Sequence, residues 1–241
     1  CDLLDGATQV AGLEALLQFS QCHPMLSALS ATTDTDALCE CLCWLADTET
    51  EDGMPMYCRF ADTRISPALL AALEPHQVDK VLHSIGEWLV INRFGGLQNI
   101  TPATQSATPP EFISNAPLVL TDTQFASMLA ASQTDEIFAV LAEGFPELVP
   151  EDARGHFHYW LSAILANAQG RGLRSSAELL QFAVIALTTQ ARFDAHPILK
   201  KTWALVATRQ ATFPQLVEIW SDKIWAALEQ PLQETSVGSA G

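Results

Sequence analysis

The chain has 241 residues, of which 49% are hydrophobic and 17% are charged. This length predicts one large or two modest domains. A chain this long and apolar can bury a core, so it is not, as a whole, an intrinsically disordered segment. Lys and Arg number 12 and Asp and Glu number 28, giving a net charge of -16 that argues against nucleic acid and against an anionic membrane surface as partners.

Hydropathy and cysteine content favour a cytoplasmic protein. No segment approaches the roughly 18 to 20 apolar residues that a membrane-spanning helix needs, and the first residues lack the pattern of a signal peptide. Because the chain begins at Cys1 rather than Met, we expect some N-terminal residues to be missing. Six cysteines are sparse for a disulfide-stapled scaffold, so we interpret them as buried reduced thiols, with a metal site and disulfides as alternatives.

The N-terminal part of the chain predicts a mixture of helices and strands, because helical and alternating apolar spacings follow one another. Asp5-Gly6 and Asp52-Gly53 are turn signals. The expected elements are a strand over residues 1–4, a helix over 10–19, a helix over 36–45 capped by Asp36, a strand over 54–60, helices over 66–73 and 75–85, and a strand over 88–91.

Residues 95–117 contain four prolines and a single charged residue, so they predict an extended connector. Everything after it reads as helical. The expected helices begin at Thr121 or Asp122 and at Asp135, and continue over residues 159–168, 179–187 (capped by Ser175 or Ser176), 199–206 and 216–228.

The predicted fold is therefore α+β, with an N-terminal mixed α/β lobe followed by an all-helical C-terminal lobe. Charge follows a similar division, because residues 1–150 carry all of the net negative charge and residues 151–241 are balanced. The expected domains are a mixed α/β lobe over 1–94, a connector over 95–117, a helical lobe over 118–235 and a flexible tail over 236–241.

An acidic run lies between the helix that ends near residue 45 and the strand that begins near residue 54. It consists of Asp47, Glu49, Glu51 and Asp52. The run lacks the ligand ladder of a calcium-binding EF-hand loop, so we expect no metal there. We interpret it either as a solvated hairpin-like loop or as an acidic face for a basic partner.

The segment 57–64 is the most distinctive stretch of the sequence. Arg59 and Arg64 are two of only four basic residues in the first 150, and Asp62 lies between them. An Arg beside an Asp can form a bidentate pair that fixes the corner between the strand and the following helix. The alternative interpretation is a partner-recognition site, with Phe60 as an apolar contact.

Motifs for catalysis are absent from the sequence. It has no nucleophile elbow, phosphate-binding loop, dinucleotide fingerprint or zinc-binding helix, so we expect no catalytic residue, no cofactor and no metal. One enzymatic alternative stays open, in which Cys58 pairs with His76 or His83.

Several short motifs, taken in order, resemble the type VI secretion system effector chaperone/adaptor family. They span most of the chain and comprise Leu3-Leu4-Asp5-Gly6-Ala7; Arg59, Phe60, Asp62 and Arg64; residues 69–73, Gln77 and Trp88; Phe145-Pro146-Glu147; Arg171-Gly172-Leu173; and Phe193, Asp194 and Pro197. The resemblance implies a non-catalytic, cytoplasmic protein. Its partners would be a secreted effector, which it holds, and the spike tip protein, on which it places the effector.

We assign partner binding to the corner residues Arg59, Phe60, Asp62 and Arg64 and to the acidic run Asp47, Glu49, Glu51 and Asp52. Two alternatives to the adaptor remain: a small cytoplasmic enzyme that uses a Cys/His pair, and a structural subunit of an assembly.

Overall fold

The computed structural model describes residues 6–20, 25–102, 116–189 and 192–230. The chain divides into two compact units. Unit 1 comprises Cys1–Ser132 and Ala153–Gly155, and unit 2 comprises Gln133–Asp152 and His156–Gly241. The helix α5 (Asp122–Gly144) contributes its first half to unit 1 and its second half to unit 2.

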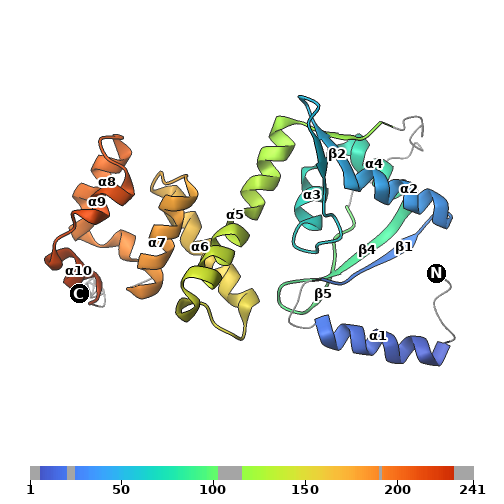
Figure 1. Cartoon of the computed structure of the whole chain (residues 1–241), viewed down its shortest axis with the longest axis horizontal. Coiled ribbons are helices and arrows are strands. Elements are labelled where there is room, and N and C mark those ends of the chain that lie inside the picture. The colour runs from blue at the N-terminus through green and yellow to red at the C-terminus, as the bar shows by residue number, and fades with distance from the viewer. Residues whose placement is uncertain (1–5, 21–24, 103–115, 190–191, 231–241) are drawn as a thin grey trace, which may run out of the picture. The chain divides into compact units, whose positions relative to one another are not determined.

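A three-stranded antiparallel sheet in unit 1 has the order β1-β4-β5. Its strands are β1 (Ser27–Ala31), β4 (Ile85–Ile91) and β5 (Leu97–Asn99). Figure 1 shows β1 and β4 running alongside each other, in a register that pairs Ser27 with Val90. The β-branched and aromatic residues of β4 favour a strand, and Trp88 and Val90 are buried on one face.

A second three-stranded sheet has the order β3-β2-β6. Its strands are β2 (Asp47–Thr50), β3 (Pro55–Tyr57) and β6 (Leu118–Leu120). β2 and β3 form an antiparallel hairpin, whereas β2 and β6 are parallel. Leu118 and Leu120 are buried in the same hydrophobic cluster as Leu45 and Trp88, so β6 is part of the core of unit 1.

The helices of unit 1 begin and end at recognisable signals. α4 (Pro75–Ser84) has a capping box between Glu74 and Gln77, and a proline opens it. α2 (Thr35–Ala46) is capped by the Asp34 carboxylate, which accepts a hydrogen bond from the Ala37 N–H. The remaining helices of the unit are α1 (Gly6–Ser20) and α3 (Ser66–Ala72).

Unit 2 is built from helices and short 3₁₀ turns around its own hydrophobic cluster. Phe182, Phe193 and Phe213 are fully buried there, and Trp203 stacks on Phe213 with the ring centroids 5.2 Å apart. Its elements after α5 are a 3₁₀ turn at Pro146–Leu148, α6 (Arg154–Gly170), α7 (Ser176–Thr188), 3₁₀ turns at Phe193–Ala195 and Pro197–Leu199, α8 (Lys200–Ala207), α9 (Phe213–Glu218) and α10 (Asp222–Leu228).

The predicted α+β fold class is confirmed, since strands and helices precede a helical C-terminal portion. None of the helices in the described ranges combines the length and the apolar character needed to cross a lipid bilayer. The predicted strand over residues 1–4 and the predicted tail over 236–241 lie outside the described residues.

Several predictions of individual elements are wrong. The cap of α2 is Asp34 rather than Asp36. No break occurs at Asp135, because α5 continues as one helix to Gly144. The segment 216–228 forms parts of two helices, with Ile219, Trp220 and Ser221 between them. The strands β1, β2 and β6 were not predicted, and the predicted extended connector contains the strand β5. The predicted domain bounds remain a prediction, and the division within α5 is a separate observation.

Candidate partner-binding site

The loop between β3 and α3 is shaped by backbone hydrogen bonds, most of which join residues three or four positions apart. The Cys58 N–H donates to the Ala46 carbonyl and thereby extends the β2–β3 pairing by one residue pair beyond β3. The Asp62 N–H then donates to the Arg59 carbonyl, and the Ser66 N–H donates to the Asp62 carbonyl. These turns reverse the chain in a few residues, so the side chains of residues 59–64 gather at one corner of unit 1.

An ion pair between Asp62 and Arg64 fixes this corner. The Asp62 carboxylate accepts hydrogen bonds from the Arg64 backbone N–H at 3.0 Å, from Nε at 2.9 Å and from Nη2 at 2.5 Å. The Arg64 guanidinium lowers the pKa of Asp62 below its ordinary value, and the nearby charge of Arg59 adds to the effect. The predicted bidentate clamp is therefore confirmed for Arg64.

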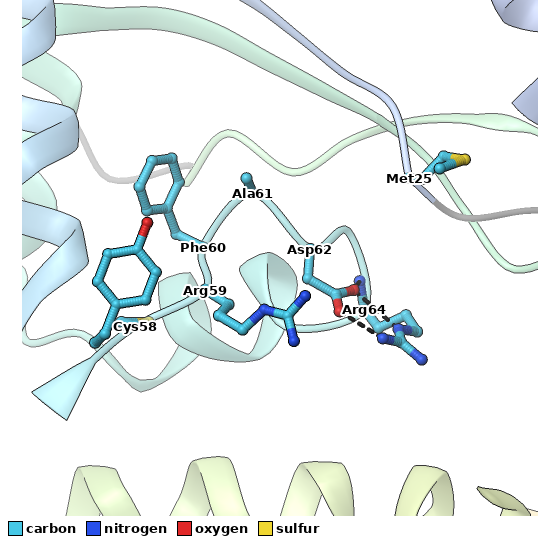
Figure 2. Close-up of a pocket in the computed structure, with 8 residues that line it drawn as sticks. Met25, Cys58, Arg59, Phe60, Ala61, Asp62 and Arg64 are labelled. Carbon is cyan, nitrogen blue, oxygen red and sulfur yellow. Dashed lines mark hydrogen bonds and ion pairs between the residues drawn. The ribbon is translucent and has the colours of Figure 1, made fainter.

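Arg59 takes no part in that clamp. Its side chain is exposed, and no direct ion pair joins it to another described residue. In Figure 2 the Arg59 side chain runs along the loop on the side where Asp62 lies. The structure thus leaves one guanidinium of the corner available to a group outside the chain.

A pocket of about 530 Å³ lies at the corner. This volume falls in the range of roughly 300–1,000 Å³ that is typical of ligand sites. Figure 2 shows the segment 58–64 curving around it. The lining residues are Met25, Tyr57, Cys58, Arg59, Phe60, Ala61, Asp62 and Arg64. All four predicted corner residues therefore lie at one pocket of unit 1.

Phe60 has a second, structural contact. Its ring meets the ring of Trp88 edge to face, with the centroids 6.1 Å apart. Because Trp88 is fully buried in the core of unit 1, this contact anchors the loop to the sheet. Phe60 is half-buried as a result and offers only part of its ring to the pocket.

The acidic run does not line the pocket but lies on the β2–β3 hairpin, where Asp47, Glu51 and Asp52 are exposed, as expected of a solvated hairpin-like segment. Asp47 and Glu49 belong to β2, whose intervening Thr48 is buried. The Glu51 carboxylate accepts a hydrogen bond from the Asp122 N–H at 2.9 Å, at the start of α5. The Asp52 carboxylate accepts from the Thr50 hydroxyl. Glu51 and Asp52 therefore have structural partners, and the role of the run in binding remains a prediction.

Cysteine chemistry at the pocket is limited by burial. Cys58 is buried, and burial raises the pKa of its thiol, which is the opposite of the shift that activates a cysteine nucleophile. Elsewhere Cys41 is buried as expected, whereas Cys39 and Cys43 are exposed on α2, so the interpretation of those two as buried thiols is wrong. In the described residues, no group of three or more His, Cys, Asp or Glu side chains is placed to hold a metal ion.

Three residues of the pocket were not selected from the sequence, namely Met25, Tyr57 and Ala61. Met25 comes from the segment before β1, more than thirty positions away from the corner, and no local pattern connects the two. Tyr57 belongs to the distinctive stretch, and its 73% exposed side chain at the end of β3 marks it as a surface residue. Exposure of an aromatic residue on an edge strand is a structural signal that the sequence does not carry.

Comparison with known protein families finds a match in the N-terminal part of the chain. Residues 3–80 match the protein family described as Domain of unknown function (DUF4123). This domain is associated with type VI secretion effector adaptors. No curated protein and no solved structure is significantly similar to the chain. The matched segment includes the whole corner from Tyr57 to Arg64.

Proposed function

We propose that this protein is a non-catalytic chaperone/adaptor that binds a type VI secretion effector and helps to load it onto the spike tip protein. The match of residues 3–80 to a domain associated with effector adaptors supports the general role. The pocket at the corner of unit 1 lies entirely within the matched segment, because all of its lining residues fall between positions 25 and 64.

The proposal rests on two features of this pocket: a loop that an ion pair holds in shape, and an arginine side chain that has no direct ion pair among the described residues. The Asp62–Arg64 pair holds the loop in shape, and Arg59 extends from that loop without a direct ion pair among the described residues. A recognition site needs such preorganisation, because ordering a loop on binding costs affinity.

The absence of an enzymatic role is part of the proposal. A nucleophilic cysteine requires a lowered pKa and a base within hydrogen-bond reach. Cys58 has a raised pKa, and the residues that line the pocket beside it include no histidine. These features support a binding site rather than a Cys/His hydrolase, and we propose that the protein acts in the cytoplasm, before secretion.

The experiment is a secretion assay in the source bacterium with the gene for this chain deleted. An adaptor that loads one effector is required for that effector alone. We therefore expect the effector to disappear from the secreted fraction while the spike tip protein is still secreted, and a plasmid copy of the gene to restore the effector.

Two results would contradict the proposal. Unchanged secretion of every effector would remove the adaptor role. Loss of both the effector and the spike tip protein would instead identify a structural subunit of the assembly.

A further inference from the structure

We infer that the outer edge of β3 and the adjoining pocket together take an extended peptide segment of the partner, in which a single acidic residue lies beside a large apolar residue. The inference rests on the proposed function and specifies what the site recognises. β3 pairs only with β2 in the described part of the chain, so its other edge carries no strand.

The hydrogen bonds of the hairpin determine which backbone groups face that edge. In an antiparallel pair, hydrogen-bonded and non-hydrogen-bonded residue pairs alternate. The Thr50 N–H donates to the Met54 carbonyl and the Cys58 N–H donates to the Ala46 carbonyl. The pair of Asp47 and Tyr57 lies between bonded positions, so the N–H and C=O of Tyr57 point away from β2.

Tyr57 is therefore the residue of β3 that offers both a donor and an acceptor to an added strand. Pro55, the other outward position, has no N–H and offers only its carbonyl. A partner residue placed opposite Tyr57 would form two backbone hydrogen bonds, which is the basis of peptide binding by strand addition. Because Tyr57 also lines the pocket, the next residues of that peptide reach the pocket.

The charges of the pocket specify an acidic residue. Of its three charged side chains, Asp62 and Arg64 neutralise each other through the bidentate pair. Arg59 has no direct ion pair with a described residue, which leaves one net positive charge at the pocket. A carboxylate matches the planar fork of a guanidinium and forms two parallel hydrogen bonds with it.

The other lining residues specify an apolar neighbour. Met25 and Tyr57 expose 57% and 73% of their surfaces, and Phe60 and Ala61 complete the apolar part of the lining. Such exposed apolar groups around one polar anchor are typical of sites that bind a side chain by burial and orient it by one charge.

The surrounding charge limits the ligand to one acidic residue and excludes a nucleic acid. Arg59 is the only basic residue in the first 60 positions, where ten are acidic. Asp47 and Glu49 lie on the neighbouring strand of the same hairpin. A second carboxylate on the peptide would be repelled there, and a phosphate backbone would find one cation where it needs several.

The test is selection from a linear random-peptide library displayed on phage, with the purified full chain as the immobilised target. We expect the wild type to enrich peptides that carry one Asp or Glu within two positions of Leu, Ile, Phe or Trp. Arg59→Glu should lose this enrichment by about tenfold or more and select Lys or Arg in its place. Lys201→Glu makes the same charge change at an exposed position on α8 and should select like the wild type.

Selection of basic or uncharged peptides by the wild type would overturn the inference, as would an acidic preference that survives Arg59→Glu, or no enrichment at all. Unchanged melting temperatures would confirm that the variants fold. If Arg59→Glu does not fold, Arg59→Gln takes its place in the test. The proposed function is tested separately with the native effector, so normal effector secretion with a failed selection would reject the peptide specificity and leave the adaptor role standing.

Discussion

Asp62 and Arg64 illustrate how much a single residue pair determines at this corner. The Asp62 side chain is only 10% exposed, and its carboxylate receives three hydrogen bonds from Arg64. Without that partner, a carboxylate at such a position would be poorly solvated. The pair therefore stabilises the loop and leaves Arg59 as the charge that faces outward.

We expect Asp62→Asn to lower the stability at pH 7 by about 1 kcal/mol, or about 2–4 °C in melting temperature, because a charge-assisted pair is lost at a partly exposed site. The pKa of Asp62 is lowered in the folded state from an ordinary value of 3.8. Its carboxylate therefore stabilises the fold fully above that value, and the contribution disappears as the pH falls through the lower, folded-state pKa.

The measurement is the melting temperature of both proteins from pH 7 down to pH 2. The gap between them should be widest at neutral pH and should narrow below about pH 3.8. A gap that is constant across this range would show that the charge of Asp62 has no role.

At this scale, sequence reasoning succeeded where the interaction is local. Asp62 and Arg64 are two positions apart, so their pairing could be predicted from spacing alone. The separation of roles between Arg59 and Arg64 could not, because both arginines are near Asp62 in sequence and only the turns of the loop place one of them outside the clamp. Met25 reaches the pocket through tertiary structure, for which the sequence offers no pattern.

Two glutamines connect four elements of unit 1. Gln124 at the start of α5 donates to the carbonyl of Ala72, the last residue of α3, and to Gln77 Oε1 on α4. Gln77 in turn donates to the Val119 carbonyl of β6. Both side chains are buried, so every lost bond would leave a polar group without water.

We expect Gln124→Ala to cost about 1–3 kcal/mol, because the Ala72 carbonyl and the Thr121 N–H would lose their partner. Gln77→Ala should cost a similar amount, and the double variant should cost less than the sum, because the two residues share one bond. Urea unfolding measures these free energies, with Ser127→Ala, an exposed position on the same helix, as the control. Additive effects would show that the two glutamines act independently.

The elements that were missed are those whose reason for existing is tertiary. β2 has the sequence Asp-Thr-Glu-Thr, which reads as a polar loop, yet it is the central strand of its sheet and its two threonines are buried. Its parallel partner β6 lies about seventy residues away, so no local signal could pair them. α5 was divided because Asp135 resembles a cap, but no proline or glycine interrupts residues 122–143 and the helix continues.

On the scale of the whole molecule, each unit has its own hydrophobic cluster, and the two clusters share no residue. Asp194 is the principal charged group inside unit 2, at 3% exposure. Its carboxylate pairs with Arg171 at 2.9 Å and with Arg192 at 3.4 Å, and its backbone carbonyl accepts from the Trp203 indole N–H. The motif residues Arg171 and Asp194 therefore meet as a structural pair.

We expect Asp194→Ala to destabilise unit 2 by about 2–4 kcal/mol, since removal of one partner leaves the Arg171 guanidinium half-buried without its counter-charge. Arg192 is 63% exposed, so Arg192→Ala should cost less than about 1 kcal/mol. Hydrogen exchange in mild urea reads the two units separately through their peptides. Unchanged protection of the unit 2 peptides in Asp194→Ala would contradict the assignment.

The fold class could be predicted because composition and helical spacing persist over long segments, whereas binding depends on one corner whose side chains only the folded chain brings together. The whole chain has a net charge of -16, and Arg59 is the single Lys or Arg among the first 60 residues, so its positive charge stands in an otherwise acidic part of the sequence. We propose that the effector binds at the pocket beside Arg59.

The most direct measurement is affinity purification of the tagged full chain from its own bacterium, with quantitative mass spectrometry of the eluate for the wild type, Arg59→Glu and Lys201→Glu. We expect a type VI effector together with the spike tip protein in the wild-type and Lys201→Glu eluates, and about tenfold less effector with Arg59→Glu. A wild-type eluate that contains neither the effector nor the spike tip protein would contradict this proposal, and so would an effector yield that is the same in all three eluates.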